Sequence, residues 1–163
     1  MQDEEHALRQ KISERLESLT TVTLATVNRE GEPCAAAVYY AHDSKLNLYF
    51  ISSKETVHGV NLLDHPGVAA TAYSEHQEWK SLSGLQLKGE ASPVTLLEFP
   101  HAASVYTKKY SFVPMVTSGS PAELLKAMAS SKLWKLVPNW IRLTDNSQGF
   151  GFKEELNLVP TKA

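Results

Sequence analysis

A run of five polar residues between a predicted strand and a short predicted helix carries the clearest chemical signal in this sequence. The run reads Ser52-Ser53-Lys54-Glu55-Thr56, and apolar residues at helical spacing follow it until His65-Pro66 ends the helix. A helix N-terminus offers unpaired N–H groups and the positive end of the helix dipole, so hydroxyls and a lysine beside it are typical of a phosphate site. The alternative is that Thr56 only caps the helix and Lys54 is only solvated, because capped turns are far more common.

The strand predicted after Pro33 is a second candidate binding surface. It reads Cys34-Ala35-Ala36-Ala37-Val38, and four small side chains in a row leave little bulk for packing. We therefore expect something flat to approach Ala36 and Ala37 closely, either a ligand ring or a neighbouring helix or subunit. Cys34 has no cationic neighbour in sequence that would lower its pKa, so we interpret it as an unreactive thiol.

The sequence lacks the common motifs of catalysis and metal binding. Its six histidines are scattered and form neither HxxxH nor HxH, which argues against a metal site. There is no GxSxG, Walker or GxGxxG motif. No side chain stands out as a general acid, a general base or a nucleophile, so no catalytic residue is predicted.

Composition and charge limit the class of protein. A chain of 163 residues with 42% hydrophobic and 21% charged residues fits one soluble globular domain, 1–163. The net charge of -2, with no basic cluster longer than Lys108-Lys109, argues against nucleic acid as a partner. A single cysteine rules out intramolecular disulfides and favours a reducing, cytoplasmic location. The first twenty residues are charged, so neither a signal peptide nor a membrane anchor is predicted.

The order of predicted elements indicates a mainly β protein with peripheral helices (α+β). Four leucine or isoleucine residues at helical spacing make 1–19 an amphipathic helix: Leu8, Ile12, Leu16 and Leu19. Alternation and β-branched residues predict strands at 21–27, 34–41, 46–51, 68–73, 85–94, 133–144 and 150–158. Six or seven such strands are best housed in an antiparallel closed or split β-barrel, which leaves few exposed edges.

A helical insertion is predicted over 95–131. Thr95-Leu96-Leu97-Glu98 reads as a capping box, although Pro100 suggests that the helix starts a few residues later. The expected helical face consists of Phe99, Ala103, Tyr106 and Tyr110. Ser120-Pro121-Ala122-Glu123 predicts the start of a further helix, with Leu124, Leu125 and Met128 as its buried side. Two roles are open for the three tryptophans, Trp79, Trp134 and Trp140: they pack in the core, which is the default expectation, or they flank a cleft.

One segment resembles the phosphate-binding segment of the pyridoxamine-5′-phosphate-oxidase-like FMN-binding split barrels. It runs from Tyr49-Phe50-Ile51-Ser52-Ser53 through Thr56 and His58 to Asn61-Leu62 and Pro66. The strands at 33–41 and 85–91 also resemble that superfamily in position and spacing. The resemblance covers roughly 19–94 and the strand near Trp140, and the run 141–151 looks like a bacterial branch of the superfamily.

This resemblance implies a homodimer of six-stranded split barrels with two FMN molecules in the subunit interface. The flavin ring would lie against Ala36 and Ala37 of the alanine-rich strand. The implied cofactor-binding set also contains the turn residues and one residue of the strand at 85–91: Ser52, Ser53, Lys54, Thr56, His58 and Gln86.

The chain departs from the family where the phosphate should bind. Pyridoxamine-phosphate oxidases proper carry arginine or lysine at several phosphate-facing positions, and the matching positions here hold Ala36, Ala41, Val57 and His58. A charge-assisted hydrogen bond is worth about 1.5–3 kcal/mol, so losing two or three would weaken FMN binding by orders of magnitude. The family's arginine and histidine group for the vitamin phosphate is not recognisable either, so oxidation of pyridoxamine phosphate is not predicted.

Two hypotheses from different classes follow. The first is a cytoplasmic, homodimeric FMN flavoprotein that works as an oxidoreductase on a small-molecule substrate. The alternative is a non-catalytic binding protein that uses the same cleft for haem, a flavin-like cofactor or a phosphorylated metabolite. Neither hypothesis requires nucleic acid or a membrane as a partner, and no metal-ligating residue is predicted.

Overall fold

Seven strands and three α-helices make up the part of the chain that the computed structural model describes, which covers residues 2–75, 78–110 and 131–158. The strands are β1 (Thr21–Val27), β2 (Pro33–His42), β3 (Leu48–Ser53), β4 (Gly67–Tyr73), β5 (Ser83–Pro93), β6 (Ser131–Asp145) and β7 (Lys153–Asn157). The helices are α1 (Gln2–Ser18), α2 (Val57–Asp64) and α3 (Phe99–Lys109), and a short 3-10 helix covers Asn146–Gln148.

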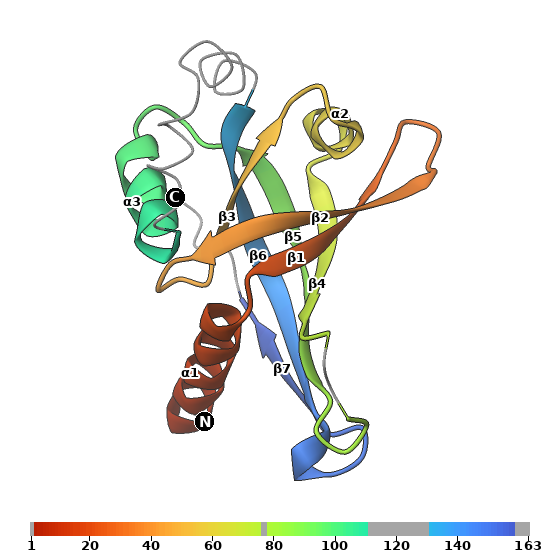
Figure 1. The fold of residues 1–163 in the computed structure, drawn as a ribbon, viewed down its shortest axis with the longest axis vertical. Helices are drawn as coiled ribbons and strands as arrows, with labels where there is room; N and C mark the ends of the chain where they lie inside the picture. Colours follow the sequence, from red (N-terminus) through yellow and green to blue (C-terminus); the bar gives the residue numbers. More distant parts are fainter. Residues whose placement is uncertain (1, 76–77, 111–130, 159–163) are drawn as a thin grey trace.

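The barrel closes because β3 pairs with β6 as well as with β2. The strand order is β3-β2-β1-β4-β5-β6-β7, and the additional β3–β6 pairing joins the first strand of this order to the sixth (Figure 1). Six antiparallel strands therefore form a closed barrel, and β7 extends the sheet beyond β6. This confirms the predicted mainly β, antiparallel barrel with peripheral helices.

The barrel interior and α1 share one hydrophobic core. Strand β1 alternates as predicted, with Val22 and Leu24 buried and Thr21 and Ala25 exposed. The predicted apolar face of α1 packs against this core through Leu8, Ile12 and Leu16, and Leu19 lies buried just past the end of the helix. Figure 1 shows α1 beside β7, at the lower part of the barrel.

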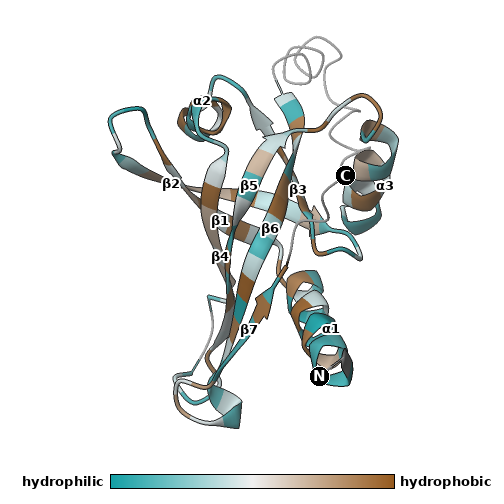
Figure 2. Cartoon of the chain, turned by 180° about the vertical axis from the view of Figure 1, so that it is seen from behind, coloured by the Kyte–Doolittle hydropathy of each residue, from teal (hydrophilic) through white to brown (hydrophobic). Residues whose placement is uncertain are grey.

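Helix α2 turns a different face to the barrel from the one that its apolar spacing suggests. Val57, Val60 and Leu63 are about half exposed or more. Figure 2 shows hydrophobic and hydrophilic segments side by side in α2. The buried side contains Asn61 instead, because its Nδ2 donates a hydrogen bond to Thr26 Oγ1 (3.1 Å) inside the barrel. A satisfied amide can be buried at little cost, so polarity alone does not identify the exposed face.

Helix α3 begins at Phe99, after the predicted capping-box residues. The Glu98 carboxylate does accept hydrogen bonds from Thr95, but these close a turn ahead of the helix rather than its first turn. The predicted face is correct at Tyr106 and Tyr110, which are buried, and wrong at Phe99, which is 53% exposed. The helix predicted from Ser120 lies outside the described residues, and the single-domain organisation over 1–163 stays a prediction.

The expectation that tryptophans lie in the core is correct only for Trp134, which is fully buried and stacks on Phe50 with ring centroids 6.1 Å apart. Trp79 is 63% exposed, which corrects the default expectation. Trp140 is partly buried on the outer side of β6. No helix among the described residues is long and apolar enough to cross a membrane.

Gly89 allows β5 and β6 to approach each other where their pairing is irregular. The register shifts between Lys88 and Gly89, opposite Pro138, which has no N–H to donate to the ladder. A Cβ atom at Gly89 would lie 2.2 Å from the carbonyl oxygen of Val137. Only glycine fits this contact without moving the backbone.

We expect Gly89→Ala to lower the free energy of unfolding by about 2 kcal/mol or more, because the added methyl group must push two paired strands apart. Gly67→Ala is the matched control, since a Cβ atom at Gly67 in neighbouring β4 would meet nothing within 4 Å. Urea unfolding followed by tryptophan fluorescence measures both. Equal stability of the two variants would show that the contact at Gly89 relaxes freely.

Candidate functional site

The turn between β3 and α2 gathers three hydroxyl groups and an imidazole. Ser52, at the end of β3, is buried, and its Oγ lies 2.6 Å from Nε2 of His58 and 3.3 Å from Oγ1 of Thr56. The direction of the Ser52–His58 hydrogen bond depends on the imidazole tautomer. Ser53 Oγ accepts a hydrogen bond from Glu55 N (3.1 Å), which shapes the turn itself.

Thr56 is the N-cap of α2, as the sequence predicts. Its Oγ1 accepts a hydrogen bond from Gly59 N (3.1 Å) and donates one to the carbonyl oxygen of Ser53 (2.8 Å). A Cβ atom at Gly59 would lie 2.3 Å from that same carbonyl oxygen, so glycine lets the turn fold tightly against the helix. The amides of Val57 and His58 precede the first intrahelical hydrogen bond and so point out of the helix end, available to a ligand.

Little positive charge accompanies these donors. Burial lowers the pKa of His58 below its usual value, so the imidazole is neutral at neutral pH in the free protein. Lys54 is exposed in the turn itself. Lys132, which no local pattern in the sequence indicates, lies opposite Ser52 in the β3–β6 register. The hydroxyls, helix amides and two lysines are the types of group that bind phosphate, although the cations are fewer than the resemblance to the oxidases leads us to expect.

The two predicted alanines lie on opposite faces of β2. Ala36 alternates with Val38 and Tyr40 toward the barrel interior, whereas Ala37 points outward. Small outward residues of neighbouring strands lie next to Ala37 and together form a nearly flat surface, here called the outer shelf: Ala35, Ala37, Thr23, Ala25, Ala69 and Thr71. The sequence shows that β2 is rich in alanine, but only the register between strands shows that the shelf extends over three of them.

A groove of about 380 Å³ lies at the edge of the outer shelf. Trp140 forms its aromatic wall, with Lys88 Nζ 4.9 Å and the Arg142 guanidinium 4.8 Å from the ring centroid. Gln86 lines the same groove and accepts a hydrogen bond from Arg142 (3.4 Å). A flat floor beside an aromatic and cationic wall suits a planar, electron-rich ring.

The predicted site residues therefore fall into groups. Ser52, Ser53, Lys54, Thr56 and His58 share the β3–α2 turn. Ala37 and Gln86 share the outer face of the barrel, in one cross-strand row that runs through Thr23 and Thr71. Ala36 belongs to the inner face. The sequence did not indicate Lys88 and Arg142, whose alternation on β5 and β6 could have placed them on one face with Gln86. Trp140 has the alternative role that the sequence left open, beside a cleft.

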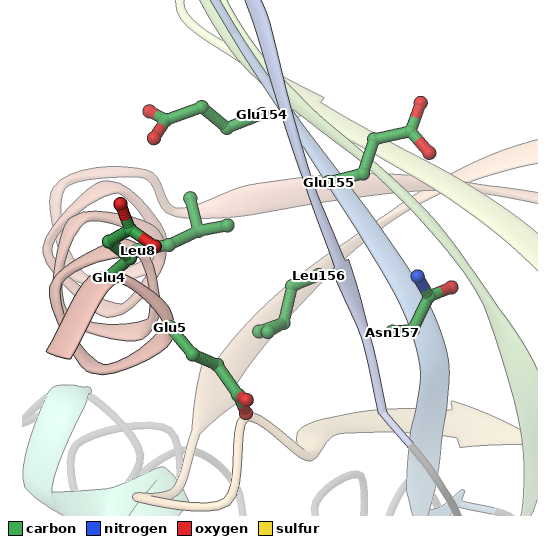
Figure 3. Close-up of a pocket in the computed structure, with 7 residues that line it drawn as sticks. All are labelled: Glu4, Glu5, Leu8, Glu154, Glu155, Leu156 and Asn157. Carbon is green, nitrogen blue, oxygen red and sulfur yellow. The ribbon is translucent and has the colours of Figure 1, made fainter. Parts of the chain in front are cut away.

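An acidic groove of about 470 Å³ between α1 and β7 is a weaker candidate. Four glutamates line it, but Figure 3 shows that Glu154 and Glu155 point to opposite sides of β7 and that Glu5 points away from Glu4. Glu154 and Glu155 are also paired with Lys11 and Arg142. Among the described residues, no group of three or more potential ligands is arranged to hold a metal ion.

Comparison with known proteins supports a shared architecture. The family model described as pyridoxamine 5′-phosphate oxidase matches residues 8–145. A UPF0306 protein of Klebsiella pneumoniae is 27% identical over 128 residues, which cover 78% of each chain.

Two solved structures share the fold at low sequence identity. A haem-binding protein of Mycobacterium smegmatis superposes with a TM-score of 0.70 at 18% identity over 91% of this chain. This chain spans 57% of that protein's length. HutZ, a haem storage protein of Vibrio cholerae, superposes with a TM-score of 0.61 at 19% identity, covering 79% of this chain and 88% of HutZ.

We expect the pKa of His58 in the free protein to lie below that of the same histidine in the unfolded chain. The folded state then binds this proton less readily than the unfolded state does. The contribution of His58 to the free energy of unfolding is therefore fully present above the unfolded-state pKa, and it is lost as pH falls from that value through the folded-state pKa. NMR titration of the His58 imidazole, with a urea-denatured sample as the reference, measures both values. A folded pKa equal to or above the unfolded one would contradict the burial of the imidazole.

Proposed function

We propose, because the chain belongs to the pyridoxamine 5′-phosphate oxidase family, that it is a flavoprotein whose β3–α2 turn binds the phosphate of FMN. The observation that carries this proposal is the convergence of three hydroxyls, the α2 N-terminus and Lys54 on one turn. In the related oxidases the same turn is expected to hold the cofactor phosphate. When bound, the flavin would supply the transfer of electrons to or from a small substrate in the cytoplasm.

The residues of this chain would bind and orient the cofactor. Ser53 and Lys54 would hold the phosphate together with the free amides of α2, and Thr56, whose hydroxyl proton is donated to the Ser53 carbonyl, would hold the turn in shape. Ser52 would act through His58, which it holds by the 2.6 Å hydrogen bond. Ala37 and Gln86 would contribute the outer face on which a flat ring can lie, with Trp140 as its boundary. No side chain of the site is assigned a proton-transfer role, and the proposal names no particular substrate.

The neutral imidazole explains why affinity should be modest. A lysine at position 58 would add a full charge, whereas His58 is held neutral by burial. A phosphate dianion beside the ring would favour its protonated form, so cofactor binding would be coupled to proton uptake. We therefore propose a flavin that exchanges readily rather than one that is retained through purification.

We further propose a homodimer built on the outer shelf. The shelf is exposed in one chain, and apolar side chains at its edges are also exposed, including Val27 (41%), Tyr39 (53%) and Tyr73 (59%). Flat surfaces of this kind are usually covered in a stable assembly, and a two-fold dimer covers both copies at once. The resemblance to interfacial FMN sites agrees with this arrangement.

We expect sedimentation velocity at micromolar concentration to give twice the chain mass of 18.0 kDa. Ala25→Arg should produce monomers, because it places a charge in the middle of the shelf. Leu97→Arg is the control, since Leu97 is 95% exposed and lies outside the shelf. A wild-type protein that sediments as a monomer would contradict the proposed FMN site in a dimer interface.

Haem binding without catalysis is the second candidate. Two proteins with this fold, from M. smegmatis and V. cholerae, are described as haem-binding and haem storage proteins. The small number of cationic side chains at the β3–α2 turn, where the phosphate would bind, is the observation that favours this alternative. The visible spectrum of protein mixed with FMN or with haem separates the two, because haem gives a Soret band and bound flavin gives shifted flavin bands.

We expect FMN to bind more tightly than riboflavin, because the turn recognises phosphate. His58→Lys should tighten FMN binding by about 1 kcal/mol or more above neutral pH, and Lys54→Ala should loosen it. Lys153→Ala, at an exposed lysine of β7, is the matched control and should change nothing. Flavin fluorescence quenching at pH 6 and pH 8 measures all four proteins.

The pH dependence has a definite sign. If phosphate raises the His58 pKa, FMN affinity is highest below the free-protein pKa and falls as pH rises toward the pKa of the complex. The ratio of wild-type to His58→Gln affinity isolates this effect, since the phosphate's own titration affects both proteins equally. Equal affinity for FMN and riboflavin, with no effect of Lys54→Ala, would show that the turn is only a helix cap.

A further inference from the structure

A cleft of about 520 Å³ lies between α1 and α3, away from the proposed flavin site. Its floor is the end of β2 with the following turn, including Ala41, His42 and Ser44. Figure 1 shows this end of β2 between α1 below and α3 above. The cleft exists because Lys109 and the barrel hold α1 and α3 in fixed positions on the same side.

His42 is a buried polar group with unused hydrogen-bonding capacity. Its side chain is only 7% exposed, and its Nε2 lies 2.9 Å from Ser13 Oγ of α1. Its Nδ1 has no hydrogen-bond partner among the described residues, and the nearest carboxylate oxygen, of Glu17, is 3.7 Å away. Buried polar atoms in proteins are almost always satisfied by a protein group, an ordered water or a ligand, so this nitrogen is a position where a polar ligand group can bind.

Lys109 brings a positive charge to the same cleft. Its Nζ donates hydrogen bonds to the carbonyl oxygens of Leu16 (2.8 Å) and Leu19 (2.7 Å), and it lies 4.5 Å from the centroid of the Tyr40 ring. These contacts leave the charge without a carboxylate partner within 4 Å among the described residues. The adjacent Lys108 is exposed at the rim.

The two helices place opposite charges on the two walls. Helix α1 contributes Glu14 and Glu17, and α3 contributes Lys108 and Lys109, of which Lys109 reaches across to the Leu16 carbonyl at the end of α1. Within the described ranges, no ion pair joins one wall to the other. Asp43, in the floor, stays negatively charged: burial works against its charged form, but hydrogen bonds from Asn47 and Tyr49 outweigh this and lower its pKa. Its carboxylate lies 3.5 Å from Nε2 of His101.

We propose that this cleft binds a small metabolite that carries both an ammonium and a carboxylate group, as an α-amino acid does. The ammonium group of the ligand lies at Glu17 of α1, and its carboxylate lies at Lys108 of α3 and at the Lys109 side chain, which reaches from α3 toward the end of α1. The imidazole of His42 provides the remaining hydrogen bond from the floor. A pure anion meets Glu17 and a pure cation meets the lysines, so the opposed walls select a ligand with both charges.

The test follows the imidazole resonances of His42 by long-range ¹H–¹⁵N NMR in the full-length protein. The probes are an equimolar mixture of natural amino acids, a mixture of simple carboxylic acids without an amine, and a mixture of simple alkylamines without a carboxylate. We expect a saturable shift of the His42 resonances with the amino acids alone. The single amino acid responsible is then found by repeating the titration with each one.

Two exposed positions give variants that should fold normally. Glu17→Gln and Lys108→Gln should each weaken the amino-acid affinity by about fivefold or more, the scale of one partly exposed charge interaction. Glu5→Gln, on α1 but outside this cleft, should leave the affinity unchanged. FMN binding should be the same in all three variants, which separates this proposal from the flavin proposal.

Several results would overturn the proposal. These are an absence of any saturable shift at tens of millimolar amino acid, carboxylic acids that shift His42 as strongly as amino acids do, or unchanged affinity in both Glu17→Gln and Lys108→Gln. Carboxylic acids that bind equally well would make the cleft an anion site that Lys109 alone explains.

Discussion

The pairing of β3 with β6 is the constraint on which the rest of the molecule depends. It joins segments about eighty residues apart and turns an open sheet into a barrel. Trp134 secures it twice, by stacking on Phe50 and by donating its Nε1 hydrogen bond (3.1 Å) to the carbonyl oxygen of Ser52. Both contacts are buried, where a hydrogen bond meets no competition from water.

This closure determines where the β3–α2 turn lies. Because the Ser52 carbonyl is held by Trp134, the Ser52 hydroxyl faces His58, and the chain leaves β3 directly into the α2 N-cap. The hydrogen bond from Asn61 to Thr26 then fixes α2 against β1. A phosphate site built from hydroxyls and amides needs this rigidity, since it has few cationic side chains to attract the anion.

Sequence reasoning predicted features that depend on neighbouring residues. The alternation of β1, the apolar spacing of α1 and the Thr56 cap are local patterns, and each appears as expected. The exposed side of α2 was not predictable from apolar spacing, because the partner of Asn61 lies thirty-five residues away on β1. Trp79 was misplaced for a similar reason, since its backbone oxygen is held by Asn146 of a distant turn (2.6 Å), which leaves the ring outside.

The candidate site divides in the same way. The turn residues are close in sequence and were found together, whereas the outer shelf depends on the register of three strands and its groove on two more. Ala36 and Ala37 show the limit most clearly. Their small size indicates a close approach, and simple alternation already implies that they cannot face the same ligand from the same side.

The central claim is that the β3–α2 turn binds the phosphate of FMN. Amide NMR of the ¹⁵N-labelled protein during titration with FMN tests this claim most directly. The claim predicts that the largest shifts occur at the amides of residues 53–59, and that inorganic phosphate reproduces them while riboflavin does not. Shifts confined to other parts of the barrel, with residues 53–59 unmoved by FMN, would contradict it.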